Sequence, residues 1–221
     1  MELTWVDGST SWFWIKVGGK TIHIDPSYYP KDHARGPEMK DKADLVLVTH
    51  SHGDHFQKET IGELLGAGTV VIGPENVVSK FNAGENIKLA EPGTQHDLGW
   101  VKIKAVHAYN LGLKGFFMHR RSKCVGYLVT VGDKTVYHAG DTDHIPEMEH
   151  LGHVDLALLP IGGTFTMDVD GAAEAARAIG SKLVVPMHNL RTPTSELKNR
   201  LSKDPGIHVI LAEHGRPFKP F

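Results

Sequence analysis

A continuous apolar run leads directly into a dense group of possible metal ligands, and this feature constrains the fold most strongly. Residues 44–49 read DLVLVT. A run of this length without polar alternation is typical of a strand buried on both faces, as in a parallel sheet covered by helices. The sequence His50-Ser51-His52-Gly53-Asp54-His55 follows at once. The pattern predicts a buried strand whose end presents polar side chains.

Strands and helices alternate along the rest of the chain. Residues 11–17 and 21–25 flank Gly18-Gly19-Lys20 and predict a hairpin, as do residues 127–131 and 135–137 around Gly132-Asp133. We expect further strands at 69–72, 100–105, 155–159, 182–185 and 207–211. Helical spacing occurs at 59–65, 170–179 and near 194–202. Hairpins combined with helix crossovers favour two packed sheets with helices outside.

Composition limits the classes of protein to consider. The 221 residues fit one domain spanning 1–221, and 40% hydrophobic residues can build a sizeable core. The net charge of −2, without a broad basic face, argues against nucleic-acid binding. No apolar run approaches the ~18 residues of a membrane span, and the first residues lack a signal-peptide pattern, so we expect a cytoplasmic protein. The one cysteine, Cys124, cannot form an internal disulfide.

The residues at 50–55 have the chemistry of a metal site. His50 and His52 leave a strand end in extended conformation, where alternate side chains point the same way, so both can chelate one metal ion. Asp54 and His55 can reach a second ion. Imidazole and carboxylate suit zinc, iron, manganese or nickel. A polar surface loop is the alternative, but it does not account for three histidines and an aspartate within six residues.

Three further candidate ligands follow predicted strands: His107, Asp141 and His188. Each alone would be more typical of a structural residue. Their shared position at strand ends favours convergence on one edge of the fold.

These motifs resemble the metallo-β-lactamase fold superfamily along nearly the whole chain. More narrowly, residues 137–142 (YHAGDT), 158–167 (LLPIGGTFTM) and 186–188 (PMH) resemble a metal-dependent hydrolase family of bacteria and archaea. That family is related to ascorbate-6-phosphate lactonase and to the N-acyl-phosphatidylethanolamine phospholipase D. The resemblance implies an α/β fold, a four-layer αββα sandwich of two mixed β-sheets.

The resemblance also implies a division of ligands between two divalent metal ions. The first ion would be bound by His50, His52 and His107, and the second by Asp54, His55 and His188, with Asp141 bridging both. Zinc is the expected metal, with manganese, nickel and iron as alternatives.

The implied function is a hydrolase in which hydroxide, activated by two metal ions, attacks a small ester, lactone or phosphodiester-like substrate. Asp54 would act as the catalytic residue, orienting the nucleophile and taking its proton. Three alternatives on the same fold remain open: an iron-dependent oxidoreductase, a nuclease and a non-catalytic metal-dependent binding module.

Two groups of residues surround the expected centre. Asp25 and His138 are candidates to hydrogen-bond the ligating histidines. Substrate contacts are expected from Thr164 and Thr166, and from the stretch 114–123 with its His119, Arg120 and Arg121. That stretch is either a lid over a small, anionic or amphipathic substrate or a contact in a homo-oligomer, and the sequence leaves both open.

Overall fold

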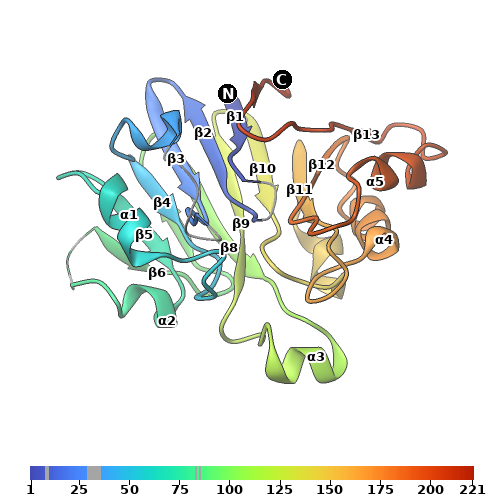
Figure 1. Ribbon diagram of the computed structural model, residues 1–221, viewed down its shortest axis with the longest axis horizontal. Helices are drawn as coiled ribbons and strands as arrows, with labels where there is room; N and C mark the ends of the chain where they lie inside the picture. The colour runs from blue at the N-terminus through green and yellow to red at the C-terminus, as the bar shows by residue number, and fades with distance from the viewer. Residues whose placement is uncertain (8–9, 29–35, 83, 85) are drawn as a thin grey trace. The chain divides into compact units, whose positions relative to one another are not determined.

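The computed structural model describes residues 1–7, 10–28, 36–82, 84 and 86–221, which divide into two compact units. The first unit comprises Met1–Ala90 with Ala212–Phe221, and the second comprises Glu91–Leu211. Each unit contains one seven-stranded mixed sheet together with helices (Figure 1). Two mixed sheets with helices confirm the predicted α/β class. The single domain over residues 1–221 stays a prediction.

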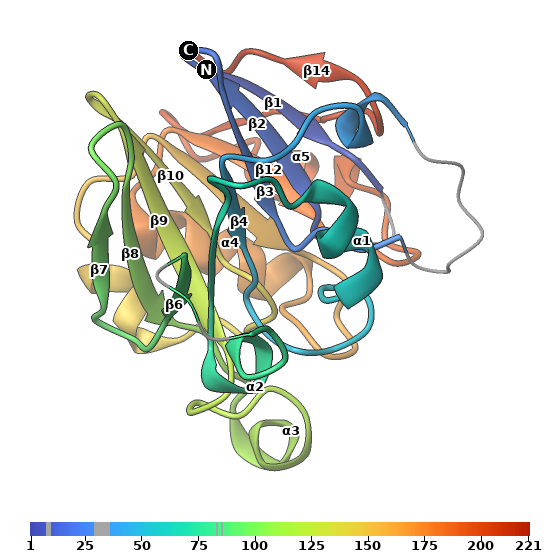
Figure 2. The same cartoon turned by 90° about the vertical axis from the view of Figure 1, so that its left-hand side faces the viewer.

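The sheet of the first unit has the strand order β14-β1-β2-β3-β4-β5-β6. Strands β14, β1, β2 and β3 pair antiparallel, whereas β3 to β6 pair parallel. Strand β14 is the edge strand beside β1 (Figure 2). The predicted β2–β3 hairpin is confirmed, with its turn at Gly18-Gly19. The strand bounds are β1 Glu2–Trp5, β2 Phe13–Val17, β3 Lys20–Ile24, β4 Leu45–Leu47, β5 Val70–Gly73, β6 Ile87–Leu89 and β14 Pro217–Phe218.

The apolar run that leads to the histidine cluster lies in the core of this unit. Strand β4 and the following Val48 are completely buried. On one face, Val46 packs in a cluster with Trp12, with Ile61 of helix α1 (Lys58–Leu64) and with Val77 of helix α2 (Glu75–Val78). The prediction of a strand buried on both faces is therefore confirmed. A short 3-10 helix, η1 (Pro37–Met39), is the other helical segment described in this unit.

The sheet of the second unit has the order β13-β12-β11-β10-β9-β8-β7. Strands β10 to β13 pair parallel, and β9 is antiparallel to both β8 and β10. Strands β8, β10, β11 and β12 therefore run in one direction, and their carboxyl ends meet at one edge of the sheet. The bounds are β7 Gln95–Asp97, β8 Lys102–His107, β9 Val125–Val131, β10 Lys134–His138, β11 Leu156–Pro160, β12 Leu183–Met187 and β13 His208–Val209.

Helix α4 (Val169–Ile179) covers part of this sheet and confirms the helix predicted at 170–179. The Asp168 carboxylate accepts a hydrogen bond from the Gly171 amide at 2.8 Å, and the helix ends at Gly180 in the left-handed region (φ 69°). Four of its alanines are completely buried. Helix α5 (Ser195–Arg200) contacts α4 beside β11 and β12 (Figure 1). A 3-10 helix, η2 (Pro146–His150), also contacts α4.

Helix α3 (Gly112–Phe117) was not predicted and overlaps the stretch expected to form a lid or an oligomer contact. It follows the carboxyl end of β8 and projects beyond it (Figure 1). Two glycines in six residues disfavour a helix in isolation, so its surroundings must stabilise it. One constraint is visible at Gly115, where a Cβ atom would overlap the carbonyl oxygen of Asn110. In the described part of the chain, no helix has the length and apolarity to cross a membrane.

Candidate metal centre

The carboxylate of Asp25 organises the loop that carries the histidine cluster. Asp25 follows β3, and the parallel pairing of β3 with β4 brings it beside the residues after β4. Its Oδ1 accepts from the Thr49 amide at 2.7 Å. Its Oδ2 accepts from the Thr49 hydroxyl at 2.7 Å and from the Ser11 hydroxyl at 3.0 Å. The carboxylate is completely buried, and these hydrogen bonds supply the partners that a buried charge requires.

The same carboxylate determines which ring nitrogen is protonated in two histidines. His55 Nδ1 lies 2.8 Å from Asp25 Oδ2, so Nδ1 is the donating nitrogen. The Thr49 hydroxyl uses its one proton toward Asp25, and His50 Nδ1, 3.0 Å from that hydroxyl, must therefore donate to it. In both rings the Nε2 atom then carries the lone pair. This is the tautomer of a histidine that binds metal through Nε2.

Candidate ligand atoms in the first unit come in two pairs. His50 Nε2 lies 3.1 Å from His52 Nδ1, and His55 Nε2 lies 3.7 Å from Asp54 Oδ2. Two nitrogen or oxygen ligands of one tetrahedral zinc ion are about 3.4 Å apart, because each bond is about 2.0–2.2 Å long. Both separations are close to that value. The structure thus places His50 beside His52 and Asp54 beside His55.

Backbone and side-chain hydrogen bonds hold this loop in one conformation. The Phe56 amide donates to the His52 carbonyl at 2.8 Å, which closes a turn. The Asn76 side-chain amide donates to the Ser51 hydroxyl at 2.8 Å. Ser51 therefore has a structural contact that helps to hold this loop.

In the second unit, the predicted ligands occupy the shared edge of the sheet. His107 is the last residue of β8, Asp141 follows β10, and His188 follows β12 directly. His188 Nε2 lies 3.6 Å from Asp141 Oδ2, and both side chains are buried. His107 is half-buried, with its ring perpendicular to the Tyr109 ring at 6.2 Å between centroids. Clusters of histidine and aspartate side chains that could hold a metal ion occur among the described residues, and none of these clusters contains His107.

His119 lies beside Asp141 and not on an exposed rim. Only 1% of its side chain is exposed, and its Nε2 lies 3.3 Å from Asp141 Oδ2. Its Nδ1 faces two oxygen atoms, Asn110 Oδ1 at 2.8 Å and the Phe165 carbonyl at 3.0 Å. This position differs from the substrate-facing one expected for the stretch 114–123.

The two arginines of that stretch have different surroundings. Arg120 is exposed, whereas Arg121 Nη2 is 2.6 Å from Glu147 Oε1 and its guanidinium stacks over Tyr109 at 5.1 Å. The Tyr109 hydroxyl donates to the same carboxylate at 2.9 Å. Burial alone would raise the pKa of Glu147, but hydrogen bonds from its own backbone amide and from Tyr109, with the charge of Arg121, lower it. Burial and Arg121 also lower the pKa of His107.

The other predicted residues have local hydrogen bonds. Thr164 is exposed. Thr166 is buried and its hydroxyl donates to the Met167 carbonyl at 3.2 Å. His138 is buried, and its Nδ1 accepts from the Gly140 amide at 3.2 Å, which supports the turn into Asp141.

Unusual backbone conformation coincides with candidate site residues. In the described chain, the non-glycine residues with positive φ are Asp25 (54°), His188 (42°) and Leu190 (50°). The His188 carbonyl also packs against Gly162, where a Cβ atom would lie 2.7 Å from it. Each such residue costs about 1–3 kcal/mol, and strain of this kind clusters at functional sites.

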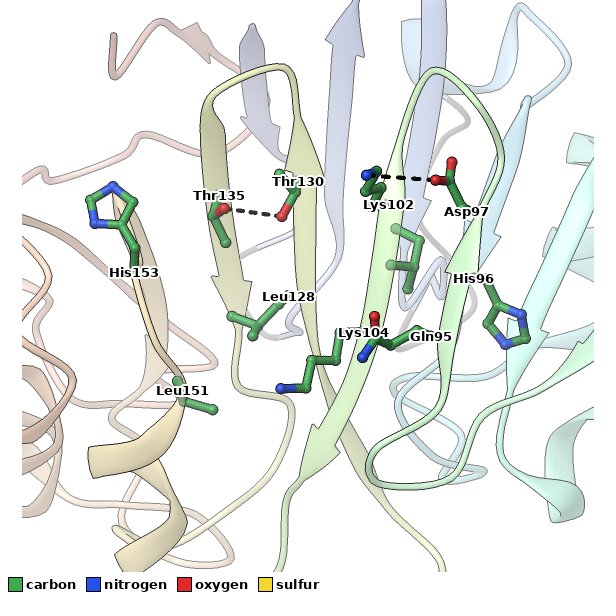
Figure 3. Close-up of a pocket in the computed structure, with 11 residues that line it drawn as sticks. Gln95, His96, Asp97, Lys102, Lys104, Leu128, Thr130, Thr135, Leu151 and His153 are labelled. Atoms are coloured by element: carbon green, nitrogen blue, oxygen red, sulfur yellow. Dashed lines mark hydrogen bonds and ion pairs between the residues drawn. The ribbon is translucent and has the colours of Figure 1, made fainter.

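A surface pocket of the second unit lies away from these residues. Its volume is about 330 Å³, and it lies over strands β7 to β10, with Lys102, Lys104 and Thr130 among its lining residues (Figure 3). None of the candidate metal ligands lines it. We therefore base the site on the ligand clusters and not on this pocket.

Several contacts of the site had no clear signal in the sequence. Thr49 could have been identified as a hydroxyl between a buried strand and His50. Ser11 and Asn110 could not have been identified, because only the folded path of the chain brings Ser11 to His55 and Asn110 to His119. The resulting donor set of imidazole and carboxylate groups, with Nε2 lone pairs set by buried acceptors, fits a divalent metal ion.

A model of the β-lactamase superfamily domain matches residues 2–188 of the chain. The chain belongs to the metallo-β-lactamase superfamily. Among its relatives, a UPF0173 metal-dependent hydrolase of Pyrococcus horikoshii is 40% identical over 212 residues, covering 90% of this chain and 92% of the relative. The chain is therefore a metal-dependent hydrolase of this superfamily.

Solved structures agree with this family. A proposed metal-dependent hydrolase from Parabacteroides distasonis has a TM-score of 0.86 at 34% identity, covering 96% of this chain and 92% of its own. The metallo hydrolase Igni18 from Ignicoccus hospitalis has a TM-score of 0.81 at 26% identity, covering 99% and 98%. These likenesses confirm the metallo-β-lactamase fold. The cytoplasmic location stays a prediction.

Proposed function

We propose that this metallo-β-lactamase-fold hydrolase uses two divalent metal ions, preferably zinc, to hydrolyse a small ester, lactone or phosphodiester-like substrate. The spacing of the ligand atoms carries the proposal. Within the first unit, His50 pairs with His52 and Asp54 pairs with His55, at 3.1 and 3.7 Å. These are the pairs that the family resemblance assigns to the first and second ion.

The proposal also includes a single hydrolase domain over residues 1–221. Two findings support this part of the proposal. The family match runs from residue 2 to residue 188 and so includes parts of both units. The likeness to the Parabacteroides distasonis structure, with a TM-score of 0.86, extends over 96% of the chain.

Bound metal ions at such a centre lower the pKa of water toward about 7 and so supply hydroxide at neutral pH. The chain's own residues have separate tasks. Asp25 and Thr49 hold His50 and His55 in the ligating tautomer. Asp54 has 28% of its side chain exposed, so we assign it to orient the nucleophile and to accept its proton. Asp141 has two carboxylate oxygens and takes the bridging role.

Metal analysis combined with a substrate panel tests the proposed function. Protein purified without added metal should contain two equivalents of divalent metal and hydrolyse one or more phosphodiester, lactone or thioester model compounds. Chelation should abolish hydrolysis, and zinc, manganese or nickel should restore it. Protein that holds only redox-active iron and hydrolyses none of these compounds would contradict the proposal and favour the oxidoreductase.

The preference for an anionic substrate can be tested at the two arginines. Arg120→Ala should raise the KM of an anionic substrate by up to about 5-fold without affecting a neutral analogue, because an exposed charge pair contributes about 0.2–1 kcal/mol. Arg121→Ala is the matched control, since the Arg121 charge is already balanced by Glu147 at 2.6 Å. Steady-state kinetics on both substrates provides the measurement. Equal KM changes for the charged and neutral substrates would contradict a charge-specific role.

A further inference from the structure

The tautomer of His119 is determined by its buried neighbours. Asn110 Oδ1 and the Phe165 carbonyl both face Nδ1, and both can only accept, so Nδ1 carries the proton. The orientation of the Asn110 amide is itself determined, because its Nδ2 donates to the same Phe165 carbonyl at 2.9 Å. In the neutral ring, Nε2 therefore carries the lone pair. That atom lies 3.3 Å from Asp141 Oδ2.

A lone pair and a carboxylate oxygen repel each other unless a cation lies between them. A proton on His119 would give a charge-assisted hydrogen bond, for which about 2.7–2.9 Å is normal. The observed 3.3 Å is longer, and His188 Nε2 approaches the same oxygen at 3.6 Å. Two ligands of one zinc ion are about 3.4 Å apart. Each histidine is thus spaced from Asp141 as two ligands of one metal ion would be, and both separations fit a bound metal ion better than a proton.

The chain is built to hold His119 next to Asp141. The stretch between β8 and β9 is closed at its base, where the backbone amide of Asn110 donates to the His119 carbonyl at 3.0 Å. Tyr109 joins this base to the loop after β10: its amide donates to the Thr142 hydroxyl at 3.1 Å, and that hydroxyl donates to the Tyr109 carbonyl at 3.0 Å. Thr142 follows Asp141 directly. These hydrogen bonds connect the two backbone segments that carry His119 and Asp141, and so keep the two side chains close together.

We propose that His119 is a ligand of the metal centre through Nε2, and that it supplies the imidazole that the family resemblance assigns to His107. The inference rests on the proposed metal centre. Asn110 acts as a positioning residue that keeps His119 in the ligating tautomer. His107, half-buried against Tyr109, is then available for a role outside the coordination shell.

The test is the metal-binding stoichiometry and affinity of His119→Phe, which preserves a buried ring but removes the ligand atom. We expect the variant to lose one metal equivalent, or to bind zinc at least about 100-fold more weakly, beyond the roughly 10–100-fold of changes next to a ligand. In the cobalt-substituted protein, the paramagnetically shifted N–H proton signal of one imidazole should also disappear. His119→Gln provides a second variant, with a polar side chain in place of the buried ring, if the first does not fold.

Three controls separate the outcomes. His153 pairs with Asp155 at the same 3.3 Å but is 77% exposed, so His153→Phe should retain all metal. His107→Ala should retain both metal equivalents as well. Unchanged metal binding in folded His119→Phe or His119→Gln, with loss in His107→Ala, would overturn the inference but leave the proposed centre standing. Wild-type protein that binds no divalent metal would overturn both.

Discussion

Replacing Asp141 with alanine is expected to remove bound metal and hydrolytic activity together. Its buried Oδ2 lies within 3.6 Å of two imidazole nitrogens, those of His119 and His188. Without the carboxylate, each histidine loses the negative charge that helps it to hold a cation. We expect zinc affinity to fall more than about 100-fold, because changes next to a ligand already cost roughly 10–100-fold. Elemental analysis after dialysis and hydrolysis rates measure the two effects.

The matched control for this variant is Asp168, a carboxylate of the same unit that is not a candidate metal ligand. Asp168 caps helix α4 through the Gly171 amide, so Asp168→Ala should cost about 1 kcal/mol of stability and leave metal binding unchanged. Two-metal occupancy that survives in Asp141→Ala would rule out the bridging role. Loss of one metal only would assign Asp141 to a single ion.

Replacing Asp25 with alanine should have the largest effect on stability. The buried carboxylate accepts from the Thr49 amide, two hydroxyls and His55 Nδ1, and all four donors would lose their acceptor. An unsatisfied buried donor costs about 1–3 kcal/mol, so for four donors we expect a loss of at least about 4 kcal/mol in the free energy of unfolding. Urea denaturation of the metal-free protein measures this loss without any contribution from bound metal.

The same variant should also weaken metal binding, by about 10–100-fold, because His50 and His55 lose the group that determines their tautomer. Asp25→Asn is the informative control. It preserves the size and one acceptor oxygen, so more of the stability should remain, while His55 no longer faces a carboxylate. Metal affinity that stays at the wild-type value in both variants would show that Asp25 is a structural residue only.

Much of the fold could be predicted from local patterns. The hairpin of β2 and β3 was recognised by its Gly18-Gly19 turn, and α4 by the helical spacing at 170–179. These signals lie within a few residues of the element that they define. The short strands β1, β6, β7 and β14 were not predicted, because two to four residues carry too little periodicity. Their conformation depends on the neighbouring strand.

Helix α3 shows the limit of local reasoning most clearly. Its sequence GLKGFF contains two glycines and has poor intrinsic helix propensity, so no helix was predicted there. The close approach of Gly115 to the Asn110 carbonyl shows that the segment is packed against its own base. His119 lies in the interior beside Asn110 Oδ1 and the Phe165 carbonyl, although its neighbours Arg120 and Arg121 are exposed.

The sequence by itself determined the chemistry of this protein: a buried strand that ends in imidazole and carboxylate groups, with further candidate ligands at other strand ends. These properties follow from residue type and from spacing over a few positions. Tertiary structure alone decided which nitrogen of each ring carries the lone pair. Ser11 and His55 meet across 44 positions, and His119 meets Phe165 across 46, because folding closes loops that no local pattern encodes. The tautomers follow from those buried contacts.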